Sequence, residues 1–273
     1  MENKILALYA ESQIHAGKGS DVGIVDQPIQ REKSTGFPII QGIKGAIRAS
    51  KLIKEKEREV FGNKPLAEKE DLAGSIAFSE AKILAFPARS PESVFIWITC
   101  PLVLARLHRL KKISGLSIPK IEENKAIVSN PTMLADGKLS LEEIEIEAAV
   151  NPEATKWAKA LSSLTPDDTM KEHFEQNFAI VPDKAFQNFV TTATEVIPRI
   201  RIDERTGTVA PGALWYEEYL PQDTIMYCIL RNASITGENL LESTIKALDG
   251  QMIAIGGNET VGKGLVYLKV LEG

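Results

Sequence analysis

Asp26 stands in a polar stretch of the chain, GIVDQPIQRE, within residues 11–41, which show little helical or strand periodicity. A loop of this length inside a compact domain is usually functional or disordered. An aspartate beside glycine and proline often forms a turn or caps a helix. The same carboxylate can act as a general base or bind a hydrated Mg²⁺ ion. The residue type therefore leaves a structural and a catalytic role open.

His15 follows the first apolar run and precedes the flexible stretch AGKGS. A histidine at this position can simply bind the local backbone. It can also contact a phosphate or a base, or act as a general acid, because imidazole titrates near neutral pH. Contact with a ligand is favoured here over proton transfer.

A basic patch follows the loop. Lys44, Arg48 and Lys51 are four and three residues apart, which places them on one face of a helix predicted over 43–62. The helix begins next to Gly42, where backbone N–H groups favour phosphate. Solvated lysines would look the same. Because the net charge is −5, a nucleic-acid partner would have to use a local patch of this kind.

A glycine loop, GGNETVGKG, occupies residues 256–264. Its segment from Gly257 to Lys263 matches G-x-x-x-x-G-K, but a nucleotide-binding P-loop continues with Ser or Thr and then a helix. Here Gly264 and a strand pattern follow. The loop therefore indicates a tight connection between strands, or a surface for a phosphate backbone in which Gly257, Gly262 and Lys263 take part.

A β-hairpin is predicted at about 196–211. Arg199 and Arg201 alternate with isoleucines, so that the two kinds of side chain point to opposite faces. The next strand, 212–219, carries Glu217 and Glu218, either of which could bring a second carboxylate towards Asp26. A plain surface hairpin would have the same pattern.

The helices and strands predicted around these residues indicate an α+β fold. Strands are expected at 4–10, 75–86, 93–99 and 144–150, helices at 101–113, within 153–190 and at 237–250, and strands again at the end. Their order suggests one or two ferredoxin-like βαββαβ units. The 273 residues lack an apolar run of ~20 residues and a leader peptide, so we expect a cytoplasmic protein with no membrane partner. Cys100 and Cys228 are expected to be buried, reduced thiols.

Three segments together resemble a known family: residues 8–49, 199–221 and 255–268. They are similar to the RAMP superfamily of CRISPR proteins, and most similar to the fourth subunit of type III-B (Cmr) effectors. The resemblance implies one domain over 1–273 with a modified ferredoxin-like, RRM-related core. It further implies a helical insertion at about 100–190 and a protruding β-hairpin thumb.

The resemblance also implies a function. Copies of the subunit would stack in a filament along CRISPR RNA (crRNA), together with other Cmr-type subunits, and the thumbs would open the duplex with single-stranded target RNA at intervals. Asp26 would support endoribonucleolytic cleavage with weakly bound Mg²⁺ or Mn²⁺, and Glu217 or Glu218 would assist. The resemblance or the residue pattern suggests the following RNA contacts: His15, Lys18, Lys44, Arg48, Lys51, Arg199, Arg201, Gly257, Gly262 and Lys263.

Three alternatives remain from the sequence. The chain could bind a guide without cutting, or act alone as a nuclease that processes CRISPR RNA precursors. It could also be a nucleotide-dependent enzyme that uses the glycine loop. Asp26 argues against the first, the single well-placed histidine against the second, and the incomplete P-loop motif against the third.

Overall fold

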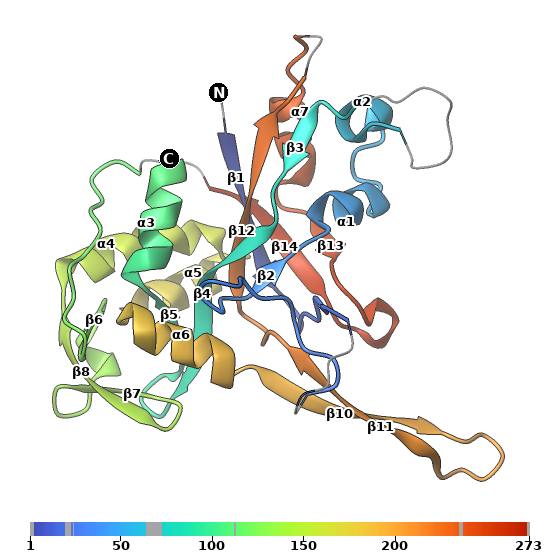
Figure 1. The fold of residues 1–273 in the computed structure, drawn as a ribbon. Helices are drawn as coiled ribbons and strands as arrows, with labels where there is room; N and C mark the ends of the chain where they lie inside the picture. Colours follow the sequence, from blue (N-terminus) through green and yellow to red (C-terminus); the bar gives the residue numbers. More distant parts are fainter. Residues whose placement is uncertain are drawn as a thin grey trace.

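Four long antiparallel strands form the centre of the molecule in the computed structural model, which describes residues 3–19, 23, 25–63, 73–111, 113–234 and 237–271. Their order across the sheet is β14 (Leu265–Val270), β1 (Asn3–Ala10), β12 (Ile225–Asn232) and β4 (Ala81–Ser90). The connection from β1 to β4 contains helix α1 (Ile43–Ala49), and that from β12 to β14 contains α7 (Leu241–Leu248) (Figure 1). The predicted α+β class is confirmed.

The sheet continues beyond β4 into the region between residues 94 and 192. The added strands follow the order β5 (Val94–Thr99), β9 (Phe178–Ile180), β6 (Lys125–Val128), β8 (Ile144–Val150) and β7 (Lys138–Leu141). Short strands complete it: β2 (Ile39–Ile40), β3 (Ile76–Phe78) and β13 (Met252–Ala254). Helices α3 (Pro101–Leu110), α4 (Pro152–Leu161), α5 (Asp168–Gln176) and α6 (Asp183–Thr192) pack around this half (Figure 1). The inserted region is therefore mixed, since strands as well as helices form it.

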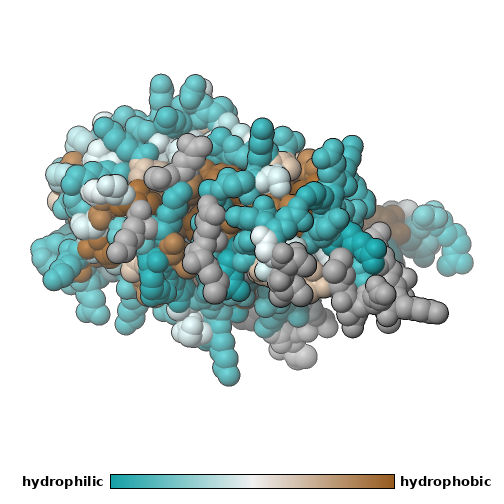
Figure 2. Space-filling view, turned by 90° about the horizontal axis from the view of Figure 1, so that it is seen from above, coloured by the Kyte–Doolittle hydropathy of each residue, from teal (hydrophilic) through white to brown (hydrophobic). Residues whose placement is uncertain are grey.

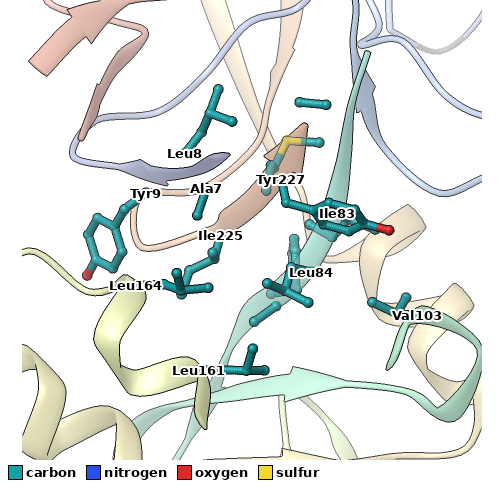
Figure 3. Packing of buried hydrophobic residues seen from close by; sticks show 14 of the residues in the cluster. Ala7, Leu8, Tyr9, Ile83, Leu84, Val103, Leu161, Leu164, Ile225 and Tyr227 are labelled. Carbon is teal, nitrogen blue, oxygen red and sulfur yellow. The ribbon is translucent and has the colours of Figure 1, made fainter. Parts of the chain in front are cut away.

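The strand predicted at 4–10 is central because its apolar run is covered on both faces. All six residues from Ile5 to Ala10 are at most 1% exposed. Figure 3 shows Leu161 and Leu164, from the end of α4 and the turn after it, on one side of Ile225 in the sheet. Cys100 and Cys228 are buried free thiols, as expected, and burial raises the pKa of Cys228 to about 12.

The helix predicted over 43–62 is broken. Helix α1 ends at Ala49, and α2 covers only Glu57–Phe61. Lys51 and Lys56 adopt left-handed backbone conformations, with φ of 61° and 58°, between the two helices. The turn brings Ile53 into the core at 7% exposure, and tertiary packing thus overrides the local helical pattern. As a result Lys51 lies outside the helix that carries Lys44 and Arg48.

A separate two-stranded hairpin, β10 (Glu195–Ile202) and β11 (Val209–Tyr219), extends away from the body (Figure 1). It is longer than the predicted 196–211, because β11 runs on without interruption to Tyr219. Arg199 lies opposite Trp215 and Ile200 opposite Leu214, so basic and apolar side chains alternate between the faces as predicted.

The surface is mixed in polarity. Seen from above, hydrophilic residues cover most of the coloured face, and hydrophobic residues show only in small areas between them (Figure 2). Such scattered apolar surface is usual for a folded chain. Within the described residues, no helix combines the length and apolar character needed to cross a membrane.

Candidate functional site

The segment that carries Asp26 is held by backbone hydrogen bonds against the base of β11. Ile14 bridges Leu220, and Gly17 bridges Ile29. The Gln30 amide donates to the Ala16 carbonyl at 2.8 Å. The sequence predicted little regular structure for residues 11–41; residues 20–22 and 24 lie outside the described part of the chain, and the flanking segments form short extended pairs. The loop is therefore anchored on both sides of Asp26.

Asp26 is exposed, and its position is set by β11. Its Oδ2 accepts a hydrogen bond from the Tyr216 amide at 2.7 Å, while the Gln27 amide donates to the Tyr216 carbonyl at 3.0 Å. The structure gives Oδ1 no hydrogen bond to any described residue. One carboxylate oxygen is thus fixed by the backbone, and the other remains available to a ligand.

Glu218 is buried and joins three segments. Its carboxylate accepts hydrogen bonds from the Ile29 amide at 3.0 Å and the Thr194 hydroxyl at 2.8 Å, and it pairs with Arg31 at 2.5 Å. These contacts bind the Asp26 loop to both strands of the hairpin base. The geometry favours a positioning role over the assisting catalytic role expected from the sequence.

Glu217 points to the opposite face of β11 and is also buried. It accepts hydrogen bonds from Trp215 Nε1 at 2.7 Å, from Asn258 Nδ2 at 2.8 Å and from the Tyr219 hydroxyl, and lies 3.7 Å from Arg199. Burial acts to raise the pKa of Glu217, but the hydrogen bonds from Tyr219 and Trp215 outweigh it and hold that pKa below its ordinary value. Glu217 thus anchors the glycine loop and the hairpin, and the same argument favours positioning over catalysis.

His15 is 7% exposed and sits between β11 and the glycine loop. Its Nδ1 lies 2.7 Å from the Glu218 carbonyl oxygen, which can only accept, so Nδ1 carries the proton. In the neutral ring Nε2 is then an acceptor, and it faces Gly17, where an added Cβ would lie 2.6 Å away. A Cβ at Gly256 would lie 2.5 Å from the His15 carbonyl oxygen. Position 17, which faces the His15 ring, and position 256, which faces the His15 backbone, therefore both require glycine.

A pocket of about 400 Å³ opens between these segments. Three glutamines that the sequence reading missed take part in it. Gln30 donates to the Gly17 carbonyl and accepts from the Gln41 amide, both at 2.9 Å, whereas the side-chain amides of Gln27 and Gln41 have no hydrogen bond to described residues. The lining is His15, Ala16, Gly17, Gly19, Gln27, Gln30, Gln41, Gly256 and Gly257. The polar composition of the loop around Asp26 was the signal that the sequence offered.

The basic residues predicted to contact RNA differ in their exposure and in their partners within the protein. Lys44 is exposed on α1, whereas Arg48 pairs with Glu57 at 3.0 Å and lies over the Phe61 ring. Lys51 lines a different pocket, between the α1–α2 turn and α7. The patch predicted for one helical face is therefore split.

Near the glycine loop, Lys263 contacts the Gln13 side chain and lies 5.4 Å above the Tyr219 ring. Gly257 packs against His15, whereas Gly262 has open space where a Cβ would be. Lys18 and Arg201 are exposed, on the Asp26 loop and the hairpin, and Arg199 is held by Glu217. The structure thus gathers His15, Gly257 and Lys263 at the base of β11 and places Arg201 further along the hairpin.

The carboxylates around Asp26 do not form a metal cage. Within the described ranges, no three His, Cys, Asp or Glu side chains are arranged to hold an ion, and Glu217 and Glu218 are engaged within the protein. The donor set is one exposed aspartate. It fits a hydrated cation that completes its ligands with phosphate oxygens, and it does not fit an ion bound by protein alone.

The fold and the loop–hairpin site agree with one class of proteins. The RAMP superfamily model matches residues 7–267, and the chain belongs to this superfamily. The CRISPR system Cmr endoribonuclease Cmr4 of Pyrococcus furiosus is 36% identical over 100% of this chain and 97% of its own length. The resemblance to the fourth Cmr subunit is confirmed, and the name of this relative agrees with the expected endoribonuclease activity.

Solved structures support the same assignment. The crystal structure of oligomeric Cmr4 from P. furiosus has a TM-score of 0.76 and 31% identity, covering 100% of this chain and 99% of the other. A chain in the cryo-EM structure of type III-B Cmr-beta bound to cognate target RNA has a TM-score of 0.77 and 23% identity, covering 99% and 98%. The second likeness shows the shared fold.

Proposed function

We propose that this chain is the repeated backbone subunit of an RNA-guided type III-B effector, which binds crRNA and cuts complementary target RNA with Asp26. One observation carries the proposal: an exposed carboxylate is fixed at 2.7 Å to the Tyr216 amide, at the base of a protruding hairpin and beside a polar glycine pocket. The P. furiosus relative is named an endoribonuclease, and related chains occur in oligomers and in a complex with target RNA.

The topology supports the finer fold assignment. The order β14–β1–β12–β4, with all neighbours antiparallel and α1 and α7 in the crossovers, is the arrangement of a ferredoxin-like βαββαβ unit. The β10–β11 hairpin is the thumb in this proposal. Its exposed apolar face, with Ile200 and Leu214, would wedge between base pairs, and Arg201 on the other face would contact phosphates.

The cleavage step uses the 2′-hydroxyl of the target ribose. That oxygen attacks the adjacent phosphorus as its proton is removed, and the bond from phosphorus to the 5′-oxygen breaks with the 2′-oxygen, the phosphorus and the 5′-oxygen in line. The 5′-oxygen takes a proton from solvent, which leaves a 2′,3′-cyclic phosphate and a 5′-hydroxyl. Asp26 takes the proton or orients the group that does, a contribution of ~10²–10⁴-fold. A hydrated Mg²⁺ or Mn²⁺ held by Asp26 and RNA phosphates would supply charge neutralisation at the phosphate. Glu218 holds the loop in place, and Glu217 holds the glycine loop.

The pocket would hold the RNA backbone next to Asp26. With the proton on Nδ1, the neutral form of the His15 ring presents Nε2 as an acceptor that suits a ribose hydroxyl, while the free amides of Gln27 and Gln41 suit phosphate or base edges. Lys18, Lys44 and Lys263 would add sequence-independent phosphate contacts. Other copies of the chain and other Cmr-type subunits would complete the filament.

The test is target cleavage by a reconstituted complex that carries Asp26→Asn. Asparagine Oδ1 can still accept the Tyr216 amide, so the loop is retained and only the charge and basicity are lost. We expect cleavage to fall by ~10²–10⁴-fold with target binding unchanged. Asp136→Asn is the matched control, because Asp136 is an exposed turn aspartate in the inserted region.

Cleavage by the Asp26→Asn complex at the wild-type rate would refute the assignment of Asp26 as the catalytic residue. Cleavage of repeat RNA by the isolated wild-type chain would instead favour a stand-alone processing nuclease.

A further inference from the structure

A second pocket, of about 600 Å³, lies between α3 and the strands β4 and β12, outside the site described above. Its lining combines basic, hydroxyl and apolar groups. The residues are Ser79, Glu80, Lys82, Arg106, Arg109, Leu110, Tyr227 and Ile229. Its volume is within the range of pockets that hold small ligands, ~300–1,000 Å³.

Three cationic side chains converge on this pocket. Arg106 pairs with Glu32 at 2.8 Å, and Lys82 lies 3.3 Å from Glu32 and 3.5 Å from Glu80. Arg109 is exposed and has no hydrogen bond or ion pair with any described residue. The lining itself therefore contains three positive charges and one negative charge, and its outermost cation is free.

The inner wall contains a tyrosine hydroxyl. Tyr227 is 2% exposed, and its hydroxyl has no hydrogen-bond partner among the described residues. Figure 3 shows the hydroxyl directed away from β12, past Ile83 and towards the side where Val103 of α3 lies. Burial raises the pKa of Tyr227 to about 12, against the opposing effect of Arg106. The hydroxyl therefore keeps its proton at neutral pH and can donate a hydrogen bond to a ligand in the pocket.

We infer that this pocket binds the phosphate group of a nucleotide. Lys82, Arg106 and Arg109 provide the charge-assisted donors that phosphate oxygens prefer, and the Tyr227 hydroxyl provides a neutral donor. Leu110 and Ile229 form the apolar wall against which a base or ribose packs. The inference goes beyond the proposed cleavage function, since no residue of the Asp26 site takes part.

The pocket connects to the Asp26 loop through one residue. Glu32, from that loop, is the partner of both Arg106 and Lys82. Hydrogen bonds from Thr35 and Arg106 outweigh burial and hold the pKa of Glu32 below its ordinary value. A phosphate bound in this pocket would therefore interact with the same two cations that pair with Glu32.

The test is a calorimetric titration of the full-length protein with AMP. We expect saturable binding that weakens about tenfold in Arg109→Ala, which loses a charge-assisted donor, and about threefold or more in Tyr227→Phe, which loses only the hydroxyl. Arg109 is exposed and phenylalanine fills the site of tyrosine, so both variants retain the fold, which their melting curves verify. Lys159→Ala, on the exposed face of α4, is the matched control, and Asp26→Asn should bind AMP as the wild type does.

Competition experiments distinguish a free nucleotide from an RNA strand as the source of the bound phosphate. Displacement of AMP by inorganic phosphate assigns the contact to the phosphate group. Displacement by a short single-stranded RNA assigns the pocket to a strand backbone, and its failure to displace AMP assigns the pocket to a free nucleotide. The inference is overturned if AMP shows no saturable binding to the wild type, or binds both pocket variants as tightly as the wild type.

Discussion

Glu218 and Arg31 form an ion pair at 2.5 Å that joins the base of the β10–β11 hairpin to the loop carrying Asp26. Both partners are largely withdrawn from solvent, with side chains 8% and 21% exposed. The same carboxylate accepts the Ile29 amide, three residues from Asp26. The position of the exposed aspartate therefore depends on a buried glutamate.

Glu218→Ala is expected to lower the free energy of unfolding by about 2–4 kcal/mol, because it leaves Arg31 without its counter-charge in a partly buried site. Denaturant unfolding of the purified chain measures the change. Glu145→Ala is the control, since its pair with Lys138 is exposed on both sides and should contribute less than ~1 kcal/mol. Equal losses in the two variants would contradict the structural role of Glu218.

Gly17→Ala is expected to weaken RNA binding by about tenfold, because the added methyl group would lie 2.6 Å from His15 Nε2 and must displace the ring. Filter binding of labelled guide RNA gives the affinity. At Gly45, within α1, an added Cβ meets nothing within 4 Å, so Gly45→Ala should leave the fold intact. Unchanged affinity in Gly17→Ala would remove His15 from the RNA site.

Lys44→Ala is expected to weaken guide binding and to reduce the slope of log affinity against log salt by about 1, because one phosphate contact is lost. Arg48→Ala should instead reduce stability, since Arg48 pairs with Glu57 and covers the Phe61 ring. Titrations at several salt concentrations distinguish the two variants. Identical salt slopes for wild type and Lys44→Ala would exclude Lys44 from the interface.

Asp223→Asn is expected to stabilise the protein at neutral pH. Burial raises the pKa of Asp223, although the Tyr9 hydroxyl donates to its carboxylate and opposes the shift. The folded state thus holds the proton more tightly than the unfolded state, so Asp223 reduces stability as the pH rises above the unfolded value of about 3.9. Asparagine keeps an acceptor for Tyr9 and tolerates the positive φ of 67°.

Melting temperatures of the wild type and Asp223→Asn, measured from pH 3 to pH 8, provide the test. The difference should be near zero at the acid end and favour the variant at the neutral end. A difference that does not change with pH would show that the protonation of Asp223 does not contribute.

Local side-chain patterns in the sequence predicted several strands, including β1, whose partners β12 and β14 lie far away in the chain. The alternation of arginine and isoleucine predicted which side chains of β10 share a face. The strand pattern after Lys263, which argued against a P-loop, corresponds to β14. The apolar run at 4–10 predicted β1. In each case a local feature of the sequence indicated the element.

Contacts between distant segments were not predictable. The break after Ala49 results from packing of Ile53 into the core, which no local propensity encodes. The pocket glutamines are scattered over 15 residues of loop and meet only because the loop pairs with itself and with β11. The adjacent glutamates looked equivalent in the sequence, and their different partners follow from the folding of Asn258 and Arg31 onto opposite faces of one strand.

Successive residues of β11 face opposite ways, which limits how the hairpin can vary in length. A one-residue shift of the register of β11 would turn Glu217 and Glu218 to opposite faces, so that neither would keep its present partner, Asn258 or Arg31. Residues 203–208 at the tip make no such contacts with the described residues of the body, so we expect insertions and deletions among relatives to collect there. The hairpin could thus change its reach in evolution without altering the spacing at its base.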